Sequence, residues 1–308
     1  MRRWRSLYGY HIIHMKEKTK DDTIIIKLYE GIHLEIYDTY TDKSYNLKGE
    51  PRNVFRIDYC FQGILEGQFE NQTFSYLGEK ETAINYEKLA LSKSFFPLKF
   101  YKGISILFFL DKINSNFKNT AQLFNIDVEK ICKNLDLQDG WYKIKINSEI
   151  SYIMNTLYEK QSLKHIEYFQ IKLFEILYLL SVINTEEYRK KEFYSGYHIN
   201  KVKKIHEYAV NNIDKNISFK KMVKNEDLSY TIFQKLFKQI YGESPYSYLK
   251  KYRLKIAAFY ISSTDRKITD IAINCGYLNA SKFSDAFKSV YGISPIQYRN
   301  GEKTTITK

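Results

Sequence analysis

The chain has 308 residues, of which 44% are hydrophobic and 16% aromatic, which is enough to build packed cores and excludes a disordered chain. Its formal net charge of +13 is concentrated at one end, because residues 198–308 hold 20 basic and 9 acidic residues while residues 1–197 hold 28 and 26. Such a basic segment predicts a polyanionic partner, either nucleic acid or an anionic membrane surface, with a plain solvated surface as the alternative.

The first hundred or so residues predict strands, because apolar and polar side chains alternate with a period of two. Ile32, Leu34 and Ile36 would share one face of a strand, and turn signals at short intervals follow. Residues 103–110, GISILFFL, predict a fully buried strand. We therefore expect residues 1–146 to form an antiparallel β-barrel or sandwich.

A second alternating run predicts the lining of this barrel. If the barrel binds an effector, we expect four inward-pointing residues to contact it: Phe55, Ile57, Tyr59 and Phe61. A plain core role is the alternative for each of them. His11 and His14 are too far apart for an HxH motif and no nearby Glu completes a ligand set, so we predict no metal and no cofactor.

From about residue 147 the hydrophobic period becomes helical and predicts two amphipathic helices. These helices would pack on the barrel, on each other or on a second copy of the chain, so a homodimer is one of the alternatives. The most apolar window, 166–183, contains three charged residues and therefore does not predict a membrane span. Residues 185–198 are charged and contain a glycine, which indicates a linker, so residues 147–197 form a predicted helical connector.

Cysteine usage and the amino terminus indicate a cytoplasmic protein. The three cysteines lie far apart and show no CxxC spacing, so we expect reduced thiols at Cys60, Cys132 and Cys275. Residues 1–18 are basic but lack the apolar core and the cleavage site of a secretory signal.

A nine-residue segment occurs twice, with small changes, in the basic end of the chain. FKQIYGESP at residues 237–245 returns as FKSVYGISP at residues 287–295, with six identical letters. In each copy, helical spacing of apolar residues leads to a glycine that stops the helix and a proline that opens the next one. A shorter helix precedes each copy, at 219–224 and at 268–274, so each copy completes a helix-turn-helix motif. We therefore expect residues 198–308 to form an all-α domain of two such motifs joined by a linker helix.

The predicted linker helix has a length that suits DNA. About seventeen residues at roughly 1.5 Å each span about 25 Å, and the flanking elements would bring the two recognition helices near 34 Å apart, the rise of one DNA turn. The exposed residues of these helices are Lys, Gln, Ser and Thr, which suit phosphates and base edges. The alternative is a helical repeat for protein contacts, and under either interpretation the core contains Phe233, Phe237, Phe283 and Phe287.

The segment ITDIAINCGYLNASKFSDAFKSVYGISPIQYR at residues 268–299 resembles the signature of the AraC/XylS family of transcription regulators. Residues 200–299 fit the whole two-motif domain of that family, and RLKIAAFYI at 253–261 agrees with its joining helix. The resemblance implies binding to double-stranded promoter DNA and, usually, activation through contact with RNA polymerase. It implies a regulator and not an enzyme, in line with the absence of a Gly-rich phosphate loop, a GxSxG motif and an HExxH motif from the sequence.

The resemblance also implies which residues contact DNA. Base contacts carry over to Thr231, Gln234 and Lys235 on the first recognition helix and to Ala280, Ser281, Ser284 and Asp285 on the second. The predicted DNA-binding set is completed by Lys238, Lys282 and Lys288. Asp285 departs from the basic or amide residue frequent in the family, and an acid there could only accept a hydrogen bond, for instance from cytosine N4. Val223 and Asp227 replace the usual small residue and glycine of the first motif, so its turn would pack differently.

The amino-terminal strand pattern resembles that of the cupin-like sensor domains of the family. FRIDYCFQGILEGQF at 55–69 and ISILFFLDKI at 104–113 are similar to the siderophore-sensing branch. The expected fold is therefore α+β and multidomain: a cupin-like antiparallel barrel, a helical connector and an all-α DNA-binding domain. The expected function is sequence-specific regulation, under the control of a small-molecule effector. The alternative is a DNA-binding regulator whose barrel serves only dimerisation or protein interaction.

Overall fold

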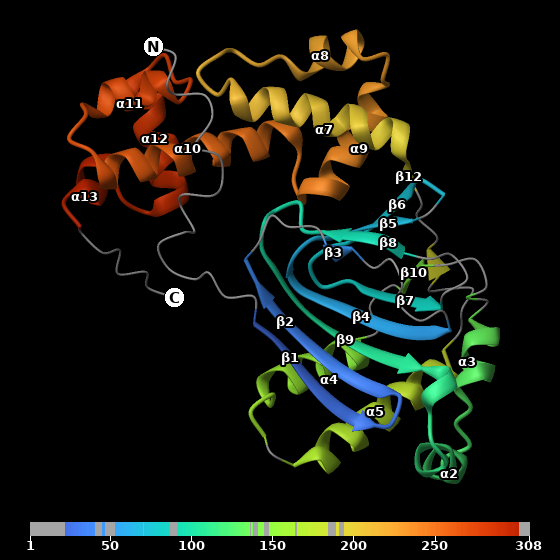
Figure 1. Ribbon diagram of the computed structural model, residues 1–308. Coiled ribbons are helices and arrows are strands. Elements are labelled where there is room, and N and C mark those ends of the chain that lie inside the picture. Colours follow the sequence, from blue (N-terminus) through green and yellow to red (C-terminus); the bar gives the residue numbers. More distant parts are fainter. Residues whose placement is uncertain are drawn as a thin grey trace. The chain divides into compact units, whose positions relative to one another are not determined.

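The computed structural model describes residues 22–40, 45–46, 53–69, 71–86, 91–135, 137, 141–144, 148–163, 165–183, 189–190 and 194–301. These residues divide into two units, one that ends at Gly196 and one that begins at Tyr197 (Figure 1). The first unit holds the strands of the described residues, and the second is helical. Predictions for His11, His14 and the amino-terminal segment fall outside the described residues.

Seven strands form the larger sheet of the first unit, in the order β1-β2-β9-β4-β7-β10-β11. Their bounds are β1 Asp22–Tyr29, β2 Ile32–Thr39, β9 Tyr101–Phe109, β4 Val54–Gly63, β7 Thr82–Tyr86, β10 Trp141–Ile144 and β11 Arg189–Lys190. The two most apolar predicted strands are direct neighbours, because β2 pairs antiparallel with β9 and places Leu34 opposite Ile106. Both residues are fully buried. The centre of the sheet is therefore built from the strands that the sequence pattern predicts.

Five strands form a second antiparallel sheet, in the order β12-β6-β5-β8-β3. Their bounds are β12 Tyr194–Ser195, β6 Thr73–Leu77, β5 Leu65–Phe69, β8 Leu91–Phe95 and β3 Tyr45–Asn46. Cys60 of β4 and Tyr101 of β9 share one buried cluster with Leu65 and Phe69 of β5. The two sheets therefore face each other across this cluster, as an antiparallel barrel or sandwich requires.

Helices cover the opposite face of the seven-stranded sheet (Figure 1). They are the short 3₁₀ helix η1 Leu110–Lys112 and the helices α2 Ser115–Leu123, α3 Val128–Asn134, α4 Ser148–Glu159 and α5 Ile166–Ser181. Fully buried Leu173 and Leu177 of α5 share one core with Ile57 of β4 and Ile106 of β9. Of the packing alternatives for the connector helices, the structure shows two, because α4 and α5 pack on the sheet and on each other.

The residues predicted to line the barrel interior lie instead on this helix-covered face. Phe55, Ile57 and Tyr59 belong to the core shared with α2 to α5, and Phe61 packs on Tyr158 of α4 with ring centroids 4.6 Å apart. The prediction of their direction was wrong, because alternation defines two faces of a strand but not which face the helices cover. The residues between them on β4, Arg56 and Asp58 among them, point toward the second sheet.

Seven helices make up the described part of the second unit (Figure 1). They are α7 Gly196–Asn211, α8 Phe219–Asn225, α9 Tyr230–Tyr241, α10 Pro245–Ser263, α11 Ile268–Asn274, α12 Ala280–Tyr291 and α13 Pro295–Arg299. The predicted duplication is present: α8 and α9 form one helix-turn-helix motif, α11 and α12 form the other, and α10 joins them. α10 packs on α9, α11, α12 and α13, so it is the common support of both motifs.

Local signals explain where these helices end. Gly242 and Gly292 follow α9 and α12 with left-handed φ values of 81° and 77°, and each donates its backbone N–H to a lysine carbonyl four residues earlier. A residue without Cβ adopts this conformation without strain. Pro245 and Pro295 then occupy the first turn of the next helix, where a missing N–H costs nothing.

The turns inside the two motifs differ. In the second motif Gly276 takes a left-handed φ of 78°, and in the first motif Asp227 takes a left-handed φ of 49°. Asp is among the few residues with a side chain that adopt this region readily. The first motif therefore forms its turn without the usual glycine, which accounts for the departure noted at Asp227.

The described helices include none that could cross a membrane. All three cysteines are free and buried, and burial raises the pKa of Cys132 and of Cys275 to about 12. Such thiols stay protonated at neutral pH and are poor nucleophiles.

Candidate nucleic-acid interface

The repeated phrase forms two helices of equal length, α9 and α12, with 12 residues each. Each buries one aromatic stripe: Phe233 and Phe237 of α9 and Phe283 and Phe287 of α12 are at most 1% exposed. Because these stripes fix the inner face of both helices, the opposite face is left to solvent.

That outer face carries the predicted DNA-binding residues. All ten lie on α9 or α12; Ser284 is half-buried, and the other nine are exposed: Thr231, Gln234, Lys235, Lys238, Ala280, Ser281, Lys282, Asp285 and Lys288. The predicted residues thus form two groups, one on the second helix of each motif, at equivalent positions of the two helices. None of the ten predicted residues is buried in the core.

Aromatic contacts hold each recognition helix on its support. Beneath α9, Phe237 lies with ring centroids 4.7 Å from Tyr241 and 5.7 Å from Tyr248 of α10. Beneath α12, Phe287 lies 4.5 Å from Tyr291 and 5.4 Å from Tyr298 of α13. The contacts to Tyr248 and Tyr298 are edge-to-face and those to Tyr241 and Tyr291 are tilted, so both helices are presented on a similar aromatic base.

The amino-terminal ends of the two helices are built differently. Asn279 caps α12, because its side chain accepts a hydrogen bond of 3.0 Å from the backbone N–H of Lys282. Ser229 holds the same place before α9 but makes no such bond. Since a side-chain cap contributes about 1 kcal/mol, the start of α12 is held more firmly than that of α9.

One basic residue beside α9 was not predicted. The ammonium of Lys220, on α8, lies 5.9 Å from the ring centroid of Tyr230, the first residue of α9. Lys220 is exposed, as are Lys221 and Lys224 on the same helix. A helix that precedes a recognition helix crosses the DNA backbone, so the signal available was the lysine content of the first helix.

Arg299, part of the family-like signature, makes structural contacts. Its Nη2 donates to the carbonyl of Arg266 at 2.6 Å and its Nε donates to the carbonyl of Ile261 at 3.3 Å. These bonds tie α13 to the end of α10. Arg299 therefore stabilises the support of the second motif.

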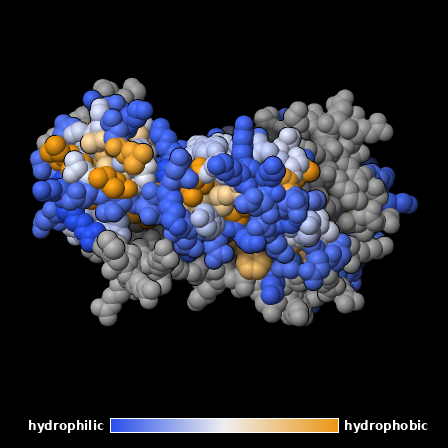
Figure 2. Space-filling model, turned by 90° about the horizontal axis from the view of Figure 1, so that it is seen from above, coloured by the Kyte–Doolittle hydropathy of each residue, from blue (hydrophilic) through white to orange (hydrophobic). Residues whose placement is uncertain are grey.

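Figure 2 shows the molecule from above, with hydrophilic side chains over much of this face, a group of hydrophobic ones at its left end and others near its centre. The exposed large hydrophobic residues of α11 to α13 and their turns are Ile273, Leu278, Val290 and Ile296. Leu278 is 98% exposed and stands in the turn before α12. A side chain there could contact a thymine methyl group.

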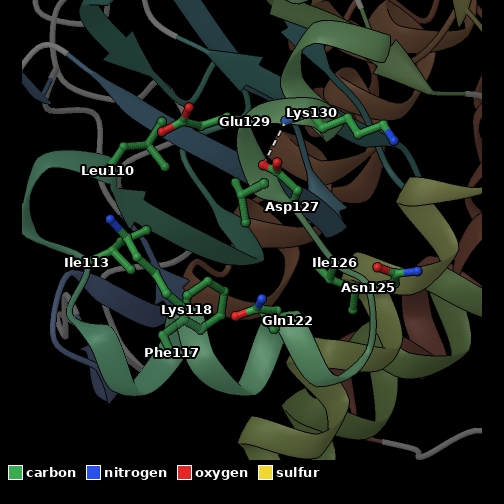
Figure 3. Close-up of a pocket in the computed structure, with 12 residues that line it drawn as sticks. Leu110, Ile113, Phe117, Lys118, Gln122, Asn125, Ile126, Asp127, Glu129 and Lys130 are labelled. Carbon is green, nitrogen blue, oxygen red and sulfur yellow. Dashed lines mark hydrogen bonds between the residues drawn. The ribbon is translucent and has the colours of Figure 1, made fainter.

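The first unit contains a cavity of about 530 Å³ between η1, α2 and α3 (Figure 3). Phe117 and Ile126 contribute apolar surface that is continuous with the core of the unit. The polar residues around it are exposed, and Asp127 accepts the backbone N–H of Lys130 at 3.0 Å as the cap of α3. Its volume is in the range of ligand pockets, but its polar groups do not converge on one point.

A buried polar group lies between the two sheets. Arg56 donates to Asp58 at 3.2 Å, and Asp58 also accepts from the hydroxyl of Ser105. Burial lowers the pKa of Arg56, but Asp58, Tyr37 and Glu35 outweigh this effect and raise it. The hydroxyl of buried Tyr101 has no hydrogen-bond partner among the atoms of the described residues. Polar side chains of β4 and β9 thus lie on the face toward the second sheet, beside the buried cluster that contains Cys60, Leu65 and Phe69.

The residues described by the structure include no group of three or more His, Cys, Asp or Glu side chains that could hold a metal ion.

Comparison with known proteins finds relatives of the duplicated region. Residues 222–301 match a family model described as a helix-turn-helix domain. The chain is 26% identical over 186 residues to the transcriptional activator RhaS of Mannheimia succiniciproducens, covering 60% of this chain and 66% of RhaS. It is 32% identical over 95 residues to the probable transcriptional regulator LumQ of Photobacterium leiognathi, covering 31% of this chain and 38% of LumQ. The chain thus spans less than two thirds of either relative.

The chain is also similar to part of a solved structure. The carboxyl-terminal domain of AraT, a response regulator from Geobacillus stearothermophilus, is 28% identical with a TM-score of 0.32, over 35% of this chain and 91% of that one. The curated relatives are named as regulators or activators of transcription and not as enzymes. Residues 222–301 of this chain therefore make up a helix-turn-helix DNA-binding domain of the AraC family of transcription regulators.

Proposed function

We propose that the chain regulates transcription by placing α9 and α12 in two successive major grooves of promoter DNA. The observation that carries the proposal is the matched pair of exposed polar faces on two equal helices, both supported by α10. Activation is the favoured outcome, since RhaS, which is similar over 186 residues, is named an activator. Contact with RNA polymerase and action in the cytoplasm, where the DNA of a bacterial cell lies, follow from this proposal.

The length of α10 supports the two-groove arrangement. Its 19 residues span about 28 Å at 1.5 Å per residue, and the helices at its two ends add to this separation. One turn of DNA rises about 34–36 Å. Two recognition helices at such a distance meet the same side of the duplex, so both can bind without bending of the protein.

Charge supports the same proposal. Residues 198–308 hold 20 basic and 9 acidic residues, and Lys235, Lys238, Lys282 and Lys288 are exposed on the two recognition helices. Each phosphate neutralised releases counterions and adds about 0.9 to the slope of log affinity against log salt. We expect a steep salt dependence, dominated by these lysines.

The test uses the full chain and a duplex selected by it from a random pool. Gln234→Ala should lower the preference for the selected sequence over a scrambled one, because an amide that reads a base edge is lost. Lys238→Ala should weaken both duplexes alike and reduce the salt slope by about 1. Gln122→Ala, on exposed α2, is the matched control and should change neither. Equal binding of all duplexes by the unmodified chain would refute the proposal.

Effector control belongs to the first unit, and the buried polar group favours it. A small molecule between the sheets would meet Arg56, Asp58 and Tyr101 and not the residues first expected to line that space. A ligand at a hundred times its dissociation constant adds about 2.7 kcal/mol of stability, so thermal-shift screening of polar metabolites detects it. Tyr101→Phe should abolish the shift, and Tyr59→Phe, on the helix-covered face, should leave it intact.

The second candidate role of the first unit is dimerisation without a ligand. Ile171, Tyr178 and Val182 are 55–66% exposed and recur along one side of α5 and its end. Such an unpaired apolar stripe is typical of helix pairing. Sedimentation should then give a dimer that Tyr178→Glu converts to a monomer, while no compound shifts the melting temperature.

A further inference from the structure

The loop that leads from α7 into the first motif touches the turn between α11 and α12 in the second. A methyl group added to Gly276 would overlap the carbonyl oxygen of Ile213 and would lie 2.7 Å from Cζ of Arg253. Gly276 also has a φ of 78°, which a residue with a side chain rarely adopts. Backbone of the loop before the first motif thus lies directly against backbone of the second motif, with no space for a side chain between them.

Arg253 of α10 occupies the same junction. Its Nη2 donates a hydrogen bond of 2.6 Å to the carbonyl of Lys215 in the α7–α8 loop. Burial lowers the pKa of its guanidinium, while Tyr277, Cys275 and Asp214 act in the opposite direction. Two of these neighbours belong to the turn of the second motif and one to the loop of the first. The guanidinium therefore lies between the two motifs.

Neither motif needs Arg253 for its own helix pair. α8 packs on α9 through Phe219, Phe233 and Phe237, and Phe283 and Phe287 form the corresponding stripe of α12. Arg299, and not Arg253, ties α13 to the end of α10. What Arg253 and Gly276 add is the connection from one motif to the other.

We infer that Arg253 and Gly276 form a clamp that fixes the distance and angle between the two recognition helices, and so set the half-site spacing that the protein accepts. This inference rests on the proposed binding to two successive grooves. Arg253 acts here as a positioning residue, because it orients the helices that would read the DNA.

A fixed pair of helices and a loose pair differ in a measurable way. Two inserted base pairs move one half-site by about 7 Å and rotate it around the DNA axis, so a fixed pair cannot engage both half-sites. A loose pair adjusts, and it gains less from the second half-site because its effective concentration there is lower. Loosening should therefore weaken binding to the two-site duplex, reduce the cost of an insertion and leave single-site binding unchanged.

The experiment measures binding of the full chain to three duplexes: one selected from a random pool by the unmodified chain, the same duplex with two base pairs inserted between its half-sites, and one half-site alone. The unmodified chain should lose at least tenfold in affinity on insertion. Arg253→Met, which keeps the apolar stem, should lose less than threefold and should match the unmodified chain on the single half-site. Arg266→Met removes the same charge from an exposed position and should retain the tenfold loss.

Gly276→Ala disturbs the same contact by steric overlap with the carbonyl of Ile213 and leaves all charges in place. Its binding to the three duplexes should therefore resemble that of Arg253→Met. A second readout needs no DNA: spin labels on cysteines introduced at exposed Lys221 of α8 and Ser289 of α12 report the distance between the motifs. The distance distribution should be narrow in the unmodified chain and broader in both clamp variants. Unchanged binding to the single half-site separates a loosened pair of motifs from a variant that has lost its fold.

The outcomes separate the two ideas. If the affinity of the unmodified chain is the same with and without the two inserted base pairs, binding to two successive grooves is refuted. A tenfold insertion loss that persists in Arg253→Met, together with an unchanged distance distribution, refutes the clamp and leaves the two-groove proposal standing.

Discussion

We predict that His206 makes the fold around the first helix-turn-helix motif sensitive to acid. It lies on α7 beneath the recognition helix α9, with its ring stacked on Tyr241 at a centroid distance of 4.0 Å and edge-to-face on Tyr248 at 5.1 Å. Its Nε2 is buried and has no hydrogen-bond partner among the atoms of the described residues. Burial lowers the pKa of His206 from 6.5 to about 3, because a charged imidazole in this aromatic surrounding loses its hydration.

The size of the effect follows from linkage. The unfolded chain binds a proton at His206 below about pH 6.5, whereas the folded chain does so only near pH 3. Lowering the pH through this window therefore favours the unfolded state, by about 1.4 kcal/mol per pH unit. Between pH 7.5 and pH 5.0 the cost is about 2 kcal/mol, a large share of the 5–15 kcal/mol that stabilises a typical domain.

The assay is urea unfolding of the full chain at both pH values, followed by far-UV circular dichroism. His206→Phe keeps an aromatic ring on Tyr241 and cannot titrate, so it removes this contribution and leaves the acid response of the other groups in place. We expect the unmodified chain to lose about 2 kcal/mol more than His206→Phe between the two pH values. His198→Phe, at the start of the same helix, is the matched control and should behave as the unmodified chain does. An equal loss in the unmodified chain and in His206→Phe would refute the reasoning.

Three further substitutions test other features. Phe287→Ala should cost about 3–5 kcal/mol in urea unfolding, since the ring is fully buried between Tyr291 and Tyr298, and a cost below 1 kcal/mol would contradict its core role. Gly292→Ala should lower stability by about 1 kcal/mol because its φ of 77° strains a residue with Cβ; an unchanged melting temperature would show that the turn adapts. Asp285→Asn should raise the affinity for all duplexes several-fold in fluorescence anisotropy, as an exposed carboxylate near phosphates is removed. Unchanged affinity would place Asp285 away from the DNA.

Much of the helical domain could be predicted because its signals are local. Gly242 and Gly292 mark the ends of α9 and α12, and Pro245 and Pro295 mark the start of the helices that follow. Capping residues and turn residues act within a few positions of the chain, so one sequence is enough to read them. The two 12-residue recognition helices and their exposed faces follow from the same patterns.

The arrangement of the sheets could be predicted only in part. Alternation on β4 indicates two faces, but the strands and helices that cover them come from distant parts of the chain. Asp58 is only 3% exposed, although a charged residue on a strand usually indicates a solvent-facing side. Its partners, Arg56 and Ser105, include one that lies 47 residues away, which no local pattern reveals. The contact that Arg253 makes between the two motifs could not be predicted from the sequence for the same reason.

The turn of the second motif can replace that of the first, but the turn of the first cannot replace that of the second. The first turn is formed by Asp227, which carries a side chain, and the second by Gly276, which lies against the backbone at Ile213. A chimera with the second turn transplanted into the first motif meets no steric obstacle at this position. The reverse chimera would drive a Cβ into the carbonyl of Ile213. The two motifs therefore differ at the turn of the second motif, which lies against the backbone at Ile213.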